Sequence, residues 1–271
     1  MKKVFFVASS VLLMAACATN PFTGKKTMAF QSNANLFPMA FQQYDEFLKE
    51  NKAVKGTKDA KRIEEVGTRI KDAAEKWLTA NGYGSYLKDY RWEYNLVDNK
   101  ELNAWCMPGG KIVFYTGILP VCKTDAGIAT VMGHEVSHAL ANHGQQRMSA
   151  SMLQQGGAIA LDLLTQNSSP IAKQTWAAAY GYGSQVGGML PFSRANETEA
   201  DKIGLTLMAI AGYNPEESVE FWSRMAAKTG GDGGSSFMST HPSNHERIEN
   251  LKKLIPEAKA EAAKFGVYFN K

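Results

Sequence analysis

The sequence predicts a mostly α-helical α+β domain with one small antiparallel sheet. Apolar residues recur with a helical period over residues 36–50, 59–79 and 124–142, whereas from Tyr90 onward the period changes to two. The 271 residues contain no internal repeat, and no long linker separates a second apolar core. We therefore expect one domain over residues 36–271.

The composition is that of a globular protein. Hydrophobic residues make up 44% of the chain and charged residues 21%, and 30 Lys and Arg against 26 Asp and Glu give a net charge of +4. No block of Lys and Arg is dense enough to bind nucleic acid electrostatically. Beyond the N-terminus no apolar run has the length of a membrane span, which excludes a polytopic membrane protein.

The N-terminal segment has the pattern of an export signal. In residues 1–16 two lysines precede an apolar stretch too short to span a bilayer comfortably, and two alanines stand before Cys17. This order resembles a bacterial lipobox, which predicts cleavage after residue 16, a lipid on Cys17 and a polar tether over 17–35. An ordinary cleaved signal with an incidental cysteine is the alternative.

The other two cysteines are consistent with an oxidising compartment. Cys106 and Cys122 form an even pair once Cys17 carries lipid, so a disulfide can join them. Two buried free thiols are the alternative, because the sequence does not place their Cα atoms within bridging distance.

The elements follow in order along the chain. Residues 36–50 and 59–79 are expected to be packing helices, and three alternating segments near Trp92, Trp105 and Phe114 are expected to form the antiparallel sheet, with a tight turn at Gly109-Gly110. Further helices are expected over 124–142, on both sides of a polar break within 144–188, over 197–210, after Asn214-Pro215 and after His241-Pro242.

The string His134-Glu135-Val136-Ser137-His138 carries the clearest chemistry. Positions i and i+4 share one face of a helix, so His134 and His138 can direct both imidazoles at one metal ion. Glu135 then lies beside the metal, where its carboxylate can take a proton from zinc-bound water. The alternative is a helix with two incidental histidines.

A catalytic zinc ion needs a third protein ligand. A second helical segment supplies two acids one turn apart, Glu197 and Asp201. Glu197 can bind zinc, while Asp201 can accept the free ring N–H of a ligand histidine and so fix its tautomer. Glu199 points away from that face and is expected to be a solvated charge.

With these motifs the chain resembles a known family. The order of HExxH, then ExEAD about sixty residues later, with NAWCMPGGKIVFYTGIL upstream, LPFSR before the acids and HPxxxxRI afterwards, resembles the gluzincin metalloproteases that include HtpX, the CAAX prenyl protease and the mitochondrial Oma protease. The lipidated context is similar to the periplasmic branch represented by BepA and LoiP. The resemblance implies a gluzincin domain holding one Zn²⁺ per chain.

Residue roles follow from the resemblance. It implies His134, His138 and Glu197 as zinc ligands, Glu135 as general base and Asp201 as the residue that orients a ligand. It also implies that His241 stabilises the oxyanion or closes onto zinc, and that Arg247 braces the intermediate or pairs with Asp201. The strand Lys111, Ile112, Val113, Phe114 and Tyr115 is implied to be an edge at the active site that accepts an extended peptide, although these side chains can also simply pack in the sheet.

The motifs and the resemblance together predict a zinc endopeptidase, lipid-anchored in the cell envelope. The resemblance implies that it lies at the periplasmic face of an outer membrane and hydrolyses misfolded or unassembled envelope proteins as quality control. Such an enzyme would meet the membrane through the lipid on Cys17, would bind no nucleic acid and would have the outer-membrane assembly machinery as a candidate partner. The alternative is a non-proteolytic chaperone or assembly factor that holds outer-membrane precursors in the same cleft.

Overall fold

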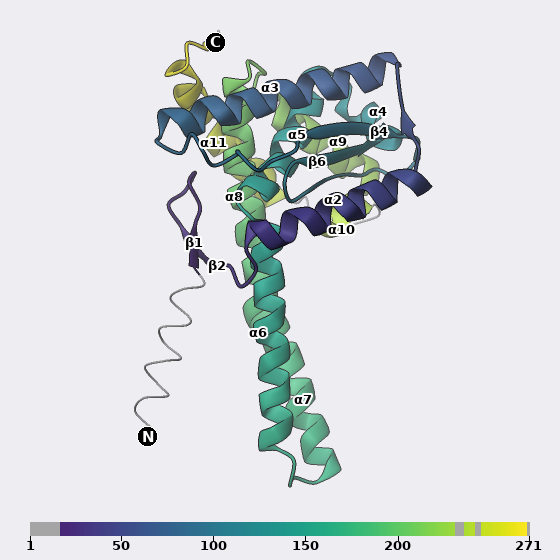
Figure 1. Ribbon diagram of the computed structural model, residues 1–271, viewed down its shortest axis with the longest axis vertical. Coiled ribbons are helices and arrows are strands. Elements are labelled where there is room, and N and C mark those ends of the chain that lie inside the picture. The colour runs from purple at the N-terminus through teal and green to yellow at the C-terminus, as the bar shows by residue number, and fades with distance from the viewer. Residues whose placement is uncertain (1–16, 231–235, 242–244, 270–271) are drawn as a thin grey trace. The chain divides into compact units, whose positions relative to one another are not determined.

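The computed structural model describes residues 17–230, 236–241 and 245–269 (Figure 1). The predicted signal peptide, residues 1–16, and most of the glycine-rich segment 230–236 lie outside the described residues. The contact pattern divides the chain into two compact units. We call them the hairpin unit, which comprises the residues before Asn33 together with 142–197, and the sheet unit, which comprises 33–141 and the residues from Thr198 onward.

The sheet unit contains most of the predicted elements. Its helices are α2 (Asn33–Glu50), α3 (Lys58–Ala80), α4 (Leu119–Cys122), α5 (Asp125–Leu140), the C-terminal part of α8 (Leu190–Ile210), α9 (Glu217–Thr229), α10 (Ser236–Thr240) and α11 (His245–Ala263). Its strands are β3 (Ala53–Val54), β4 (Glu93–Val97), β5 (Ala104–Met107) and β6 (Lys111–Tyr115), followed by a 3-10 turn, Thr116–Ile118. The prediction of a mostly helical fold with one small sheet is confirmed.

The sheet itself is mixed, and the expected antiparallel arrangement is therefore wrong for one pair. The strand order is β3-β4-β6-β5, with β4 parallel to β6 and the other pairs antiparallel. The predicted turn at Gly109-Gly110 does join β5 to β6, and both glycines adopt positive φ, 84° and 87°. Because β6 returns between β4 and β5, it has a partner on each side, as β4 does.

The core of the sheet unit lies against this sheet. Ile63, Val66 and Ile70 of α3 form the predicted stripe and are almost completely buried, as are Ile112 and Phe114 of β6. Helix α3 contacts both β4 and α5 (Figure 1). Helix α5 contacts β5, so the helix that carries the HExxH string lies beside the terminal strand of the sheet.

The hairpin unit combines a short β-ladder with two long helices. Strand β1 (Cys17–Thr19) pairs antiparallel with β2 (Lys26–Met28), so the segment predicted as a polar tether contains a short β-ladder. Helices α6 (His143–Leu164) and α7 (Pro170–Ser184) flank the predicted polar break, and a π-helical turn, Gln185–Met189, leads into α8. Of the helices described in either unit, none has the length and apolarity needed to cross a bilayer.

Candidate metal centre

The HExxH residues lie on helix α5, whose N-terminus is fixed by a side-chain cap. Thr124 caps it with a side-chain oxygen that accepts a hydrogen bond from the Gly127 amide at 3.0 Å, and Asp125 lies in the first turn, where a negative charge stabilises the helix dipole. From this start His134 and His138 fall on one face, one turn apart. His134 and Glu135 are buried, at 2% and 3% exposure, so their groups act in a medium of low polarity.

Three imidazoles converge at this face. The Nε2 atoms of His134 and His138 lie 3.1 Å apart, and His134 Nε2 lies 3.1 Å from Nδ1 of His241, which follows directly on α10. Ligand atoms of His134, His138, Glu197 and His241 all lie within 4.8 Å of one another. Glu197 reaches this group on α8, the same continuous helix that carries Asp201 one turn later.

This donor set suits a zinc ion. Ring nitrogens that face each other at hydrogen-bond distance repel through their lone pairs unless a proton or cation lies between them. Three imidazole nitrogens and one carboxylate oxygen are the donors that zinc prefers. His134, His138 and Glu197 can therefore hold zinc as the sequence predicted, with His241 close enough to be a fourth ligand.

Glu135 lies next to the candidate ligands, on the same helix as His134 and His138. Its Oε1 lies 3.4 Å from Nε2 of His241, and the carboxylate side chain is 4% exposed. A carboxylate at this distance from the ligand cluster can receive a proton from a group held there and later return it. His241 lies between the candidate ligands and Glu135, since its Nδ1 faces His134 and its Nε2 faces Glu135.

Asp201 and Arg247 form the buried side of the centre. Asp201 Oδ1 lies 2.9 Å from Nδ1 of His134, which leaves the other ring nitrogen of His134 directed at the cluster. Arg247 pairs with Asp201, which is one of the two roles the sequence left open for it, and its guanidinium lies over the Trp222 ring at 3.6 Å. Burial alone would raise the pKa of Asp201, but Arg247 and the hydrogen bond with His134 outweigh it and hold that pKa below its usual value.

Two glycines allow α5 and α8 to approach closely at this point. A Cβ on Gly204 would lie 2.9 Å from the carbonyl carbon of Gly133 and 2.9 Å from the amide nitrogen of His134. The backbones therefore touch one residue before the first ligand histidine. This contact sets the distance between His134 and Asp201.

The structure corrects one sequence interpretation, decides a second that was left open and adds one residue. The strand Lys111 to Tyr115 is not an edge, because β6 is paired on both sides; the terminal strands are β3 and β5, of which β5 contacts α5. Cys106 and Cys122 are free thiols. Trp222 of α9, which the sequence did not single out, packs edge-on against the His134 ring with centroids 6.0 Å apart. No sequence signal distinguishes it from an ordinary core aromatic.

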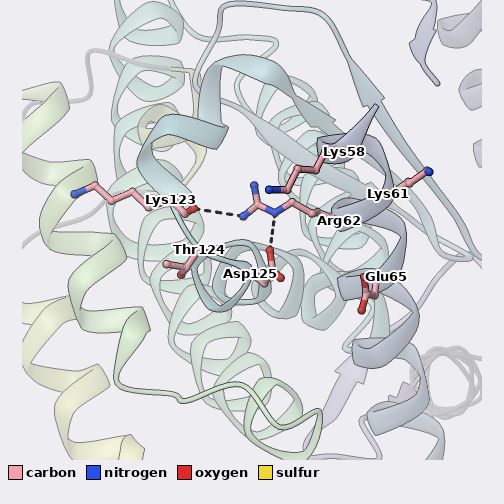
Figure 2. Close-up of a pocket in the computed structure, with 7 residues that line it drawn as sticks. All are labelled: Lys58, Lys61, Arg62, Glu65, Lys123, Thr124 and Asp125. Carbon is pink, nitrogen blue, oxygen red and sulfur yellow. Dashed lines mark hydrogen bonds and ion pairs between the residues drawn. The ribbon is translucent and has the colours of Figure 1, made fainter. Parts of the chain in front are cut away.

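The sheet unit also has a pocket away from the histidine cluster (Figure 2). It has a volume of about 620 Å³ and is lined mainly by charged residues at the starts of α3 and α5, with Arg62 bound to Asp125 at 2.6 Å. Figure 2 shows the amines of Lys61 and Lys123 directed away from Arg62. The pocket shares no residue with the histidine cluster, so its size does not make it the functional site.

The helical fold, the HExxH helix and the glutamate on a second helix define the gluzincin class of metalloprotease domains. Residues 61–255 match the model of peptidase family M48, and the chain belongs to that family.

Similar curated proteins agree with this assignment. The chain is 35% identical over 204 residues to the mitochondrial metalloendopeptidase OMA1 of Saccharomyces cerevisiae, which covers 73% of this chain and 56% of that protein. It is 38% identical over 189 residues to the OMA1 protein of Arabidopsis thaliana, covering 70% and 36%. It is 27% identical over 164 residues to the Beta-barrel assembly-enhancing protease of Escherichia coli, covering 58% and 33%. The chain thus spans about half or less of the length of these relatives.

Proposed function

We propose that this protein is a zinc-dependent endopeptidase. The observation that carries the proposal is the convergence of His134, His138, Glu197 and His241, with ligand atoms within 4.8 Å, directly beside the Glu135 carboxylate. Membership of family M48 and the OMA1 relatives support it. When bound, zinc would supply a Lewis acid that polarises the scissile carbonyl and acidifies a water molecule.

The chain's own residues perform the proton transfers. Glu135 takes the proton of the attacking water and then delivers it to the leaving amine. His241, whose Nε2 lies 3.4 Å from Glu135, can donate an N–H to the oxygen on which negative charge develops. Asp201 holds His134 in one tautomer, and Arg247 keeps Asp201 ionised.

The corrected strand order supports β5 as the strand that receives substrate. Among the described strands β5 has a partner, β6, on one side, and it contacts α5. Alternate backbone groups along its other side can bind an extended peptide by strand addition. Binding through the backbone tolerates many side chains, which suits an enzyme that degrades unfolded polypeptides.

The cellular role is proposed as quality control in a bacterial envelope. The lipobox-like sequence before Cys17 supports export and a lipid anchor, and the similarity to the Beta-barrel assembly-enhancing protease supports a site near outer-membrane assembly. Misfolded or unassembled envelope proteins would be the substrates, and the periplasmic face of the outer membrane the location.

The test combines metal analysis with a peptidase assay. Glu135→Gln removes the base and keeps the ligands, so we expect about one zinc per chain and a loss of casein cleavage of at least 10²-fold. Glu64→Gln, at an exposed position of α3, is the matched control and should cleave normally. Normal cleavage by Glu135→Gln, or wild-type protein that binds no zinc, would refute the proposal.

A further inference from the structure

The α6–α7 hairpin carries large apolar side chains that the rest of the described chain does not cover. The two helices lie side by side (Figure 1), and Leu164, Ile171 and Tyr182 are 84%, 78% and 73% exposed. Ile159, Leu163 and Trp176 are exposed as well, at 63%, 60% and 58%. Such a concentration of apolar surface in one element marks a site of interaction with a partner or a membrane.

Charge is nearly absent from the same stretch. Between Met148 and Ser193 the charged residues are Asp162 and Lys173. These two lie on facing helices and approach to 3.5 Å, so each compensates the other. The hairpin therefore has neither the charged rim of a protein interface nor a net charge that would keep it in water.

The apolar side chains surround the hairpin instead of forming one face. Trp176 lies five residues after Ile171, and Leu164 five after Ile159, which is about 140° around the helix in each case. No residue of α7 is buried. A folded partner or a second copy would cover one face and leave the other exposed, whereas lipid can cover all of them.

The turn between the helices satisfies much of its own backbone. Thr165 caps the end of α6, since its amide and its hydroxyl both donate to the Leu161 carbonyl, at 2.9 and 2.8 Å. Ser169 accepts a hydrogen bond from the Ala172 amide at the start of α7. Internal hydrogen bonds of this kind lower the cost of moving a turn out of water.

We propose that the outer half of this hairpin, from Ile159 to Trp176, inserts into the interfacial layer of a lipid bilayer. The predicted lipid on Cys17 belongs to the same unit, in which the Phe30 amide after β2 donates to Ser149 of α6 at 3.1 Å. The lipid and the apolar side chains of the hairpin would then both attach the hairpin unit to the same membrane. Insertion itself requires neither the lipid nor peptidase activity, so it can fail or succeed independently of the proposed function.

Trp176 is a natural probe, because the other four tryptophans lie in the sheet unit. The full chain is mixed with vesicles of phosphatidylcholine whose acyl chains are brominated, and tryptophan quenching is compared with that on unbrominated vesicles. We expect quenching of the wild type that Trp176→Phe removes. The double variant Leu164→Asp/Ile171→Asp should partition into the vesicles at least about tenfold more weakly than the wild type.

Tyr268→Asp is the control, since Tyr268 is 76% exposed outside the hairpin and its substitution adds one negative charge, as each of the two hairpin substitutions does. It should be quenched like the wild type. Circular dichroism checks folding, which substitutions at such exposed positions should leave intact. Equal quenching of the wild type and Trp176→Phe would overturn the proposal. So would a lipid-independent dimer, seen by sedimentation, that the double variant dissociates while vesicle quenching of Trp176 is absent.

Discussion

Asp201 and Arg247 are joined by two short contacts in the interior, Nη2 to Oδ1 at 2.6 Å and Nε to Oδ2 at 2.9 Å. Asp201 also holds His134, so the ion pair connects α11 to the first ligand of the metal centre. Both side chains are about 7% exposed. A carboxylate at this depth depends on its cation, because it would otherwise lie desolvated and uncompensated.

Removing the cation should therefore destabilise the fold. We expect Arg247→Met to lower the free energy of unfolding by about 3–5 kcal/mol, measured by urea denaturation in the presence of a chelator. Asp201→Asn/Arg247→Met should recover part of this loss, since it removes the stranded charge. A single variant as stable as the wild type would contradict the role assigned to the pair.

Removing the negative charge of Asp201 should mainly weaken zinc binding. Asp201→Asn no longer fixes the His134 tautomer by charge, and we expect zinc affinity to fall about 10- to 100-fold. Competition with a chromophoric chelator measures this. Glu199→Gln on the same helix is the control and should bind zinc like the wild type.

The contact between Gly133 and Gly204 makes a separate prediction. In Gly204→Ala the new methyl group meets backbone at 2.9 Å, so α5 and α8 must move apart. We expect a loss of about 1–3 kcal/mol in stability together with weaker zinc binding. Gly144→Ala, where a Cβ would meet nothing within 4 Å, is the control. Equal stability and equal zinc affinity of the two variants would contradict the role given to the close approach of α5 and α8.

Peptide binding along β5 can be tested on the substrate. N-methylation of a backbone amide that pairs with the strand removes one hydrogen bond, worth about 1 kcal/mol, and should raise KM about fivefold. Methylation of an amide three or more residues outside the strand should have no effect. Equal KM values for all N-methylated peptides would exclude strand addition.

The buried Cys122 thiol should resist modification and make stability depend on alkaline pH. Burial raises its pKa from the ordinary 9.0 to about 12. Alkylation in the native state should therefore be slow at pH 8, and fast once the chain is unfolded in urea.

The sign of the pH effect follows from proton binding. Above pH 9 the unfolded chain loses the Cys122 proton while the folded chain retains it up to about pH 12, so the free energy of unfolding falls as the pH rises through this range. Cys122→Ala should show a smaller fall between pH 9 and 11. Identical slopes would contradict the raised pKa.

Local patterns predicted the helices and showed which candidate ligands share a helical face, because a spacing of four residues fixes a shared face. The pairing of His134 with His138, and of Glu197 with Asp201, can be read from this spacing alone. The order of strands in the sheet could not be read in this way. Alternation indicates that residues 111–115 form a strand but not which strands flank it, so β6 was wrongly expected at the edge. Trp222 was missed for a similar reason, since its contact with His134 depends on how α9 packs.

The candidate ligands His134 and His241 are 107 positions apart in the sequence, so the candidate metal centre can exist only in the folded chain. An unfolded copy of this protein would have no assembled site, and would itself be an extended polypeptide of the kind proposed above as substrate. Zinc, by binding the native state, would protect each molecule from its neighbours, and zinc depletion would expose the population to self-digestion.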